Sequence, residues 1–223
     1  MAGMKTNRLT QHCLLGLTLA LSACSDPPSS EQGSVQQTNA PTAVTDGSQL
    51  KFSDPRGTDA KKLEFDRLLD LANQGDSHAQ IQIAWLYRDD DSLEKHDEIA
   101  LQWFLKAAST GDSIAQDNVG IMYRDGIGAD KNPAEAVKWF EKAAIAGNAE
   151  AQGNLGHMYF DGQGVNQDNV MGYAWSSLAV KNGNSTWAKT NIDLAKKIMK
   201  PEQIAAADKS IEQWKIGQPL SIK

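Results

Sequence analysis

Cysteine is almost absent from this chain. The 223 residues include two cysteines, Cys13 and Cys24, and none follows Cys24. The rest of the chain therefore has no residue for a disulfide, a thiolate metal site or a cysteine nucleophile. Basic clusters are absent as well, since 22 Lys and Arg stand against 28 Asp and Glu and no Lys/Arg-rich run interrupts the acidic body. A surface for nucleic acid is therefore not expected.

Long hydrophobic runs are also missing, apart from one short segment near the start. Residues 13–23, CLLGLTLALSA, are eleven residues long. A membrane-spanning helix needs about 20 apolar residues, so this segment is too short to cross a bilayer. With Lys5 and Arg8 before it, the segment predicts a signal peptide over residues 1–23.

The end of this segment, LSAC at residues 21–24, resembles the lipobox of bacterial lipoproteins. The resemblance implies cleavage between Ala23 and Cys24 and attachment of acyl chains, palmitate among them, to Cys24. Two or three acyl chains would anchor the protein firmly. By the sorting pattern of such lipoproteins, Ser25 favours the outer membrane. The alternative is an ordinary signal peptide in which Cys24 is incidental.

Residues 24–60 contain few large apolar side chains and are rich in Ser, Gln, Thr, Pro, Gly and Asp. Such a composition cannot supply a core, so we expect a disordered tether between the lipidated Cys24 and a folded domain over residues 61–216. Residues 217–223 are expected to form a tail.

The body of the chain repeats every 36 residues. Full repeats cover residues 75–110, 111–146 and 147–182, and partial units cover 61–74 and 183–216. Aligned positions hold the same aromatic residue in each full repeat, which predicts that they form the core. These residues are Trp103, Trp139, Trp175, Tyr87, Tyr123 and Tyr159.

Each repeat predicts two helices. In the second repeat, apolar residues at helical spacing indicate helices over residues 113–124 and 133–145. A glycine ends each second helix, and Asp112 or Asn148 can then cap the next helix. Asn132 can cap the second helix of the pair.

The two ends of the repeat domain predict closing helices. Residues 63–75 look like a second helix without its partner, residues 185–199 take the place of a first helix, and a last helix starts at Pro201. Internal repeats leave an apolar surface bare at each end, so these helices would serve as caps. The predicted fold class is all-α, an α/α solenoid of 36-residue helix-turn-helix repeats with N- and C-terminal helical caps.

The motif AQ..(L/V)G.MY.DG.GV, followed by A..W..KAA..G, resembles the Sel-one-like repeat family, a branch of the tetratricopeptide-like helical repeats. The first repeat departs from it with Ala84 for Gly and with Asp90 and Ser92 for the loop glycines, and the third with Gly172 and Ser176. The resemblance implies a right-handed superhelix that serves as a scaffold for protein binding, in bacteria often in the cell envelope.

Gly126 and Gly128 lie just before a predicted helix, as the glycines of a phosphate-binding loop do. The pair recurs 36 residues later but is replaced by other residues 36 residues earlier, and a helix precedes it where a dinucleotide loop needs a strand. The glycines therefore predict a turn, and no cofactor is expected.

Other catalytic patterns are weak. Residues 48–51, SQLK, match a motif of penicillin-recognising enzymes, but the companion motifs are absent from the sequence. The four histidines are scattered, so no metal site is expected. An envelope hydrolase or β-lactam-binding protein is the alternative to a scaffold. A structural component of a cell-envelope or peptidoglycan-associated complex is a narrower form of the scaffold hypothesis.

The first helix of each repeat also carries a stripe of residues that do not repeat. In helix-pair solenoids the first helices line the concave surface, so this variable stripe is a candidate for partner binding. The alternative is that its side chains pack on the neighbouring repeat. Gly153 lies in the stripe, whose candidate binding residues are His78, Ile81, Trp85, Arg88, Ile114, Asp117, Ile121, Arg124, Glu150, His157 and Phe160.

Together these features predict a lipid-anchored lipoprotein of the bacterial cell envelope, at the outer membrane and facing the periplasm. Its repeat domain would bind an unidentified envelope protein, and neither nucleic acid nor metal. The chain is not expected to be an enzyme.

Overall fold

The computed structural model describes residues 58–89, 96–183 and 186–222, all of which belong to one compact unit over residues 43–223. The predicted signal peptide, Cys24, the SQLK motif and most of the predicted tether lie outside the described residues, as do Asp90 and Ser92 of the first repeat. Helix α1 begins at Thr58, so the last three residues of the expected tether belong to a helix.

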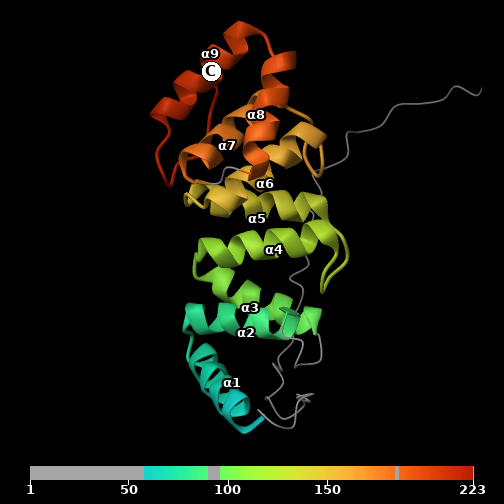
Figure 1. Cartoon of the computed structure of the whole chain (residues 1–223), viewed down its shortest axis with the longest axis vertical. Helices are drawn as coiled ribbons and strands as arrows, with labels where there is room; N and C mark the ends of the chain where they lie inside the picture. The colour runs from blue at the N-terminus through green and yellow to red at the C-terminus, as the bar shows by residue number, and fades with distance from the viewer. Residues whose placement is uncertain (1–57, 90–95, 184–185, 223) are drawn as a thin grey trace, which may run out of the picture. The chain divides into compact units, whose positions relative to one another are not determined.

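The described residues form helices and turns without a strand. Figure 1 shows the helices in chain order. They are α1 (Thr58–Asn73), α2 (Ser77–Asp89), α3 (Asp97–Ser109), α4 (Ser113–Asp125), α5 (Pro133–Ile145), α6 (Ala149–Asp161), α7 (Asn169–Lys181), α8 (Thr186–Ile198) and α9 (Pro201–Gln213).

The helices pack as a solenoid. The two helices of each full repeat, α2 with α3, α4 with α5, and α6 with α7, pack most extensively on each other, and each pair then packs on the next. This consecutive packing confirms the predicted all-α solenoid. The repeated unit cannot bury its apolar face alone, so stacking of neighbours supplies the core.

The predicted caps form. Asp112 accepts hydrogen bonds from the backbone N–H groups at the start of α4, at 2.9 and 3.0 Å. Asn132 and Asn148 do the same for α5 and α6, at 3.1 and 2.9 Å. Each cap satisfies an N–H group that has no partner within its own helix. The helix starts are therefore determined by local sequence.

Gly126 and Gly128 belong to the turn between α4 and α5. Both have positive φ, 77° and 69°, which a glycine adopts without steric cost. A Cβ atom on Gly128 would overlap the Asp97 carbonyl at the start of α3. The glycines thus end one helix and let the turn approach the preceding repeat, as the sequence predicts.

A buried glutamine joins each first helix to the helix before it. In each case the side-chain Nε2 donates to a backbone carbonyl eight residues earlier, in the last turn of the preceding helix. The bonds run from Gln80 to Ala72 at 3.0 Å, from Gln116 to Ala108 at 3.3 Å, and from Gln152 to Ala144 at 3.0 Å.

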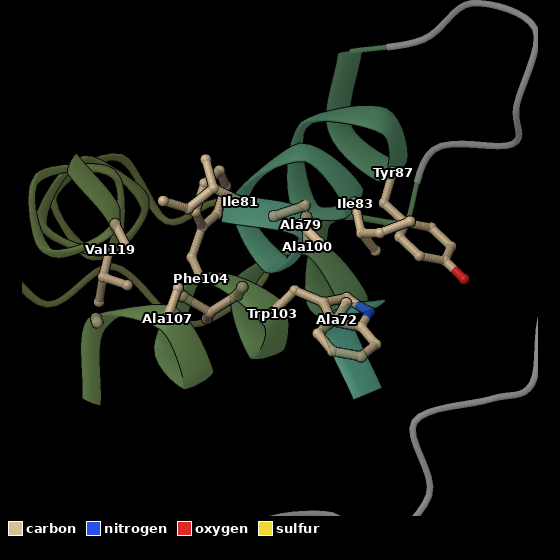
Figure 2. Packing of buried hydrophobic residues seen from close by; sticks show 14 of the residues in the cluster. Ala72, Ala79, Ile81, Ile83, Tyr87, Ala100, Trp103, Phe104, Ala107 and Val119 are labelled. Atoms are coloured by element: carbon tan, nitrogen blue, oxygen red, sulfur yellow. The ribbon is translucent and has the colours of Figure 1, made fainter. Parts of the chain in front are cut away.

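The core forms two clusters, one around α2 and α3 and one around α6 and α7. Figure 2 shows the Trp103 ring beside Ala72 of α1, with Ala79 and Ile83 of α2 in the same core cluster. The tryptophan column is less uniform than the sequence predicts. Trp103 is fully buried, whereas Trp139 is only partly buried and has the Lys142 ammonium 3.9 Å from its ring centroid.

The C-terminal end departs from the repeat. Helix α9 packs on α7 and does not pair with α8 as the second helices of the full repeats pair with their partners. The expected tail folds back: the Gly217 N–H donates to the Ile145 carbonyl at 2.8 Å, and Leu220 and Ile222 pack against the second core cluster. Just before the tail, Trp214 packs edge-on against Trp175 with ring centroids 6.2 Å apart. Residues 217–222 therefore belong to the folded domain.

Gln152→Leu is expected to destabilise the domain because the fully buried Gln152 side chain makes two hydrogen bonds. It donates to Ala144 and also accepts from the Asn182 side chain at 2.9 Å. Leucine would remove both bonds and leave the Asn182 amide without this acceptor, at a cost of about 2 to 4 kcal/mol in unfolding free energy. Urea unfolding measures the loss, with Gln213→Leu at the exposed end of α9 as control. A loss no larger than the control's would contradict the structural role of this bond.

Candidate functional site

The structure places the variable stripe partly on the surface and partly in the core. The exposed members include Trp85 and Ile114, with 38 % and 50 % of their surface accessible. Arg88, Ile121, Arg124 and Phe160 are half-buried, and His78, Glu150 and His157 are exposed. We call this surface of α2, α4 and α6 the first-helix face.

Two candidate residues are not available to a partner. Ile81 is 3 % exposed and belongs to the first core cluster, and Asp117 is 7 % exposed. Ile121 and Phe160 also pack against the second cluster. For these residues the packing alternative holds, because the neighbouring helices cover them.

Polar side chains connect α2 to α4. The Arg88 guanidinium donates to the Asn118 Oδ1 atom at 3.4 Å, and the Trp85 indole N–H points to the same oxygen at 3.5 Å. Asn118 in turn donates to the Ile114 carbonyl at 2.9 Å. These contacts hold Trp85 beside Asn118 of α4, with part of the Trp85 side chain in solvent.

The same connection recurs between α4 and α6. Arg124 donates to the Asn154 Oδ1 atom at 3.2 Å, and Asn154 donates through Nδ2 to the Asp117 carboxylate at 2.9 Å. Arg124 also pairs with Asp125 through two bonds of 2.8 Å. The two hydrogen bonds to Asn154 are partly buried and each includes a charged group, so they fix the position of α6 relative to α4.

Sequence reasoning missed the two asparagines. Asn118 and Asn154 are 36 residues apart, and so are Arg88 and Arg124, so the repeat itself was the available signal. From the sequence, the repeated aromatic positions are assigned to the core and both arginines to the variable stripe, although the arginines repeat. A polar pair that repeats together at one spacing indicates instead a bond between successive first helices.

The Asp117 carboxyl has a raised pKa. Burial is the main cause, and the pKa rises from 3.8 to about 6. The hydrogen bond from Asn154 and the charge of Arg124 lower the pKa, whereas the charge of Glu150 raises it further. Asp117 therefore carries its charge at neutral pH in an environment that disfavours the charge.

A polar cavity of about 690 Å³ opens where α4, α6 and α8 meet. Its size is that of a ligand pocket, but its lining lacks the apolar side chains that dominate most such pockets. The lining residues are Arg124, Asp125, Lys131, Glu150, Gly153, Asn154, His157, Gln163, Thr190 and Asn191. Three of them, Arg124, Glu150 and His157, are candidate binding residues from the sequence.

The described residues contain neither a cluster that could hold a metal ion nor a helix that could cross a membrane. Within residues 58–89, 96–183 and 186–222, no three His, Cys, Asp or Glu side chains are grouped to hold a metal ion. Over the same residues, no helix combines the length and apolar character needed to cross a membrane.

The fold is a solenoid of helical repeats, and the first-helix face is the surface on which the repeats differ. A model of the Sel1 repeat matches residues 77–112, 113–148 and 149–184, two residues later than the boundaries predicted from the sequence. The chain is 35 % identical to a Sel1 repeat protein from Oxalobacter formigenes, with a TM-score of 0.53, over 58 % of this chain and 97 % of that one. It belongs to the Sel1 repeat family, whose repeats generally mediate protein–protein interaction.

A second solved structure is similar over more of the chain. It is c5321, described as a protective antigen present in uropathogenic Escherichia coli strains displaying an SLR fold, and it is 32 % identical with a TM-score of 0.64. The match covers 69 % of this chain but 32 % of the c5321 chain, so the protein spans about a third of that relative. A comparison with curated proteins gives no match.

Asp117→Asn is expected to stabilise the domain in a pH-dependent way. Because the pKa of Asp117 is about 6 in the fold, the folded chain takes up a proton between about pH 6 and about pH 4 that the unfolded chain does not. The carboxyl therefore opposes folding most above pH 6, and this cost disappears as pH falls. The variant should gain about 1 to 3 kcal/mol near pH 8 and almost nothing near pH 4.

Urea unfolding at the two pH values measures this difference. Asp125→Asn is the matched control, because the bond from Arg124 lowers the pKa of Asp125 and its loss should have the opposite sign. An equal gain for Asp117→Asn at both pH values would show that the buried charge is not the cause.

Proposed function

We propose that this protein is a non-catalytic scaffold that binds another protein through its first-helix face. The observation that carries the proposal is the exposure of Trp85 and Ile114 on that face, on helices α2 and α4, whose other large apolar residues are buried or half-buried. Tryptophan and arginine are frequent anchors of protein interfaces, and Arg88 lies next to Trp85 through their shared partner Asn118. Membership of the Sel1 repeat family supports the same function.

The polar cavity also suits binding better than catalysis. His157, which borders the cavity, has Nε2 at 3.4 Å from a carboxylate oxygen of Asp161. A histidine beside a carboxylate can serve as a base with its orienting group, but a hydrolase also needs a nucleophile within reach of that base. The lining offers one hydroxyl, on Thr190, and neither Ser nor Cys, which favours a scaffold over the alternative of an envelope hydrolase.

We further propose that the scaffold is a lipoprotein of the bacterial cell envelope. The LSAC sequence at residues 21–24, after a basic start and a short apolar segment, supports attachment of lipid at Cys24. Ser25 supports the outer membrane, with the repeat domain facing the periplasm. The partner is then a protein of the envelope.

Photo-crosslinking tests the binding face. A benzoylphenylalanine placed at Ile114 or His157, on the first-helix face, is expected to trap the same partner in cells, because both side chains are exposed there. Lys106 and Lys142 are matched exposed positions on the second helices and should give no such adduct. Adducts of equal yield at all four positions, or none at Ile114 and His157, would contradict the proposal.

Metabolic labelling with palmitate tests the anchor. The chain should carry label and sediment with membranes, and Cys24→Ser should abolish the label and leave the signal peptide uncut. Cys13→Ser is the control and should behave as the wild type, because Cys13 lies within the predicted signal peptide. Label retained in Cys24→Ser, or absent from the wild type, would rule out lipidation at this residue.

A further inference from the structure

Helix α8 exposes two neighbouring aliphatic side chains near the C-terminal end of the stack (Figure 1). Leu194 and Ile198 lie one helical turn apart, with 54 % and 63 % of their surface accessible. Met158 and Met122 hold the position of Leu194 in the two preceding repeats, and both are fully buried. Because α9 packs on α7, this edge of α8 stays in solvent where the full repeats bury theirs.

Lysine side chains share the exposed side of α8 with this apolar edge. Lys197 follows Leu194 by three residues, so the two are neighbours on the helix surface. One acidic residue, Asp193, is exposed between positions 188 and 200. The exposed basic residues of the same segment are Lys189, Lys196, Lys197 and Lys200. In a chain with a net charge of -6, the surface of α8 is therefore a local positive patch.

The residue types of this patch differ from those of the first-helix face. Protein interfaces are enriched in Trp, Tyr and Arg and depleted in Lys. Trp85 and Arg88 fit that composition. The α8 patch instead combines Lys with Leu and Ile, as helices on anionic bilayer surfaces do, where lysine ammonium groups reach the phosphates and aliphatic side chains enter below them. The composition therefore favours an anionic lipid surface over a protein.

The proposed lipid at Cys24 would keep such a surface close to the domain. Residues 25–57 separate Cys24 from the start of α1. A flexible chain of that length has a root-mean-square reach of about 30 Å. Contact between the domain and the bilayer then takes place within one molecule and at a high effective concentration, so a weak intrinsic affinity is sufficient.

We propose that the exposed side of α8 binds an anionic bilayer surface. Leu194 and Ile198 enter the boundary between headgroups and acyl chains, and the ammonium groups of Lys189, Lys196 and Lys197 contact lipid phosphates. The inference rests on the proposed lipid anchor, which supplies the bilayer, and it adds a second contact through the folded domain.

Fluorescence quenching by lipids tests the proposal. In the acylated protein Cys13 has left with the signal peptide and Cys24 carries lipid, so Ile198→Cys provides a single thiol for a nitrobenzoxadiazole dye. The labelled protein is reconstituted into phosphatidylcholine vesicles that contain nitroxide-labelled lipid, with or without phosphatidylglycerol. Phosphatidylglycerol should increase quenching several-fold. Salt at about 1 M should remove most of this increase, because the screening length falls to about 3 Å.

Leu63→Cys with the same dye is the matched control. Leu63 is an aliphatic residue with 72 % of its surface exposed, and it lies on α1, nearer to the anchor along the chain. Charges on α1 are partly paired, as in Lys62 with Asp66 at 2.8 Å. Quenching at Leu63 should be several-fold weaker than at Ile198 and independent of phosphatidylglycerol. Equal quenching at the two positions would mean that the tether alone brings the domain near the lipid, and it would overturn the proposal.

Charge variants identify the groups that bind. The triple variant Lys189→Gln/Lys196→Gln/Lys197→Gln should reduce quenching at Ile198 to the level at Leu63, because it removes the attraction to the phosphates. Asp193→Asn should increase quenching, because it removes the negative charge of the patch. A triple variant with the same change in charge on α3 and α5 should have no effect, and it consists of Lys106→Gln, Lys138→Gln and Lys142→Gln.

Full quenching in the α8 triple variant, or reduced quenching in Asp193→Asn, would show that charge does not direct the contact and would overturn the proposal. A dye at Ile198 that phosphatidylglycerol leaves unquenched would also overturn it and leave an acidic protein as the occupant of the patch. Flotation of the same vesicles separates this inference from the proposed anchor. Protein that floats with the vesicles without quenching at Ile198 keeps the anchor and loses the α8 contact, whereas protein that does not float loses both.

Discussion

The buried bond from a glutamine to the end of the preceding helix is the constraint on which the solenoid depends. Gln80, Gln116 and Gln152 each place a polar amide inside an otherwise apolar stack. A buried amide must keep its partner, so the bond fixes the distance and the rotation between each first helix and the last turn of the helix before it. The same bond recurs every 36 residues, so consecutive repeats share this contact.

The first-helix face differs between repeats because single residues of the first helices depart from the repeated pattern. The connections through Asn118 and Asn154 tie successive first helices together and hold Arg88 and Arg124 at the surface. At Gly153 and Thr190 the helices still stack, but the side-chain hydrogen bonds between successive first helices cannot form, and a cavity results. A scaffold of this kind can therefore change what it binds by single substitutions in the first helices, while its core and turns stay the same.

Much of the fold could be predicted because its signals are local. The bounds of α4 and α5 agree with the predicted helices within one residue, since Asp112 and Asn132 cap them through bonds that span three residues or fewer. The surface could be predicted only in part. Ile81 and Asp117 have the spacing of exposed residues, but neighbouring helices bury them. Such burial depends on pairs far apart in the sequence, such as Asp117 with Asn154, which periodicity along one helix does not contain.

The sequence by itself determined the period, the helices, their caps and the family, because each rests on residues within one repeat. Only the tertiary structure decided that α9 packs on α7, that residues 217–222 return to the domain, and that the space beside α8 stays open. These features depend on how the last helices meet a surface built by earlier repeats. Packing across that surface depends on shape and free hydrogen-bonding groups, and neither is visible in the spacing of residues along the chain.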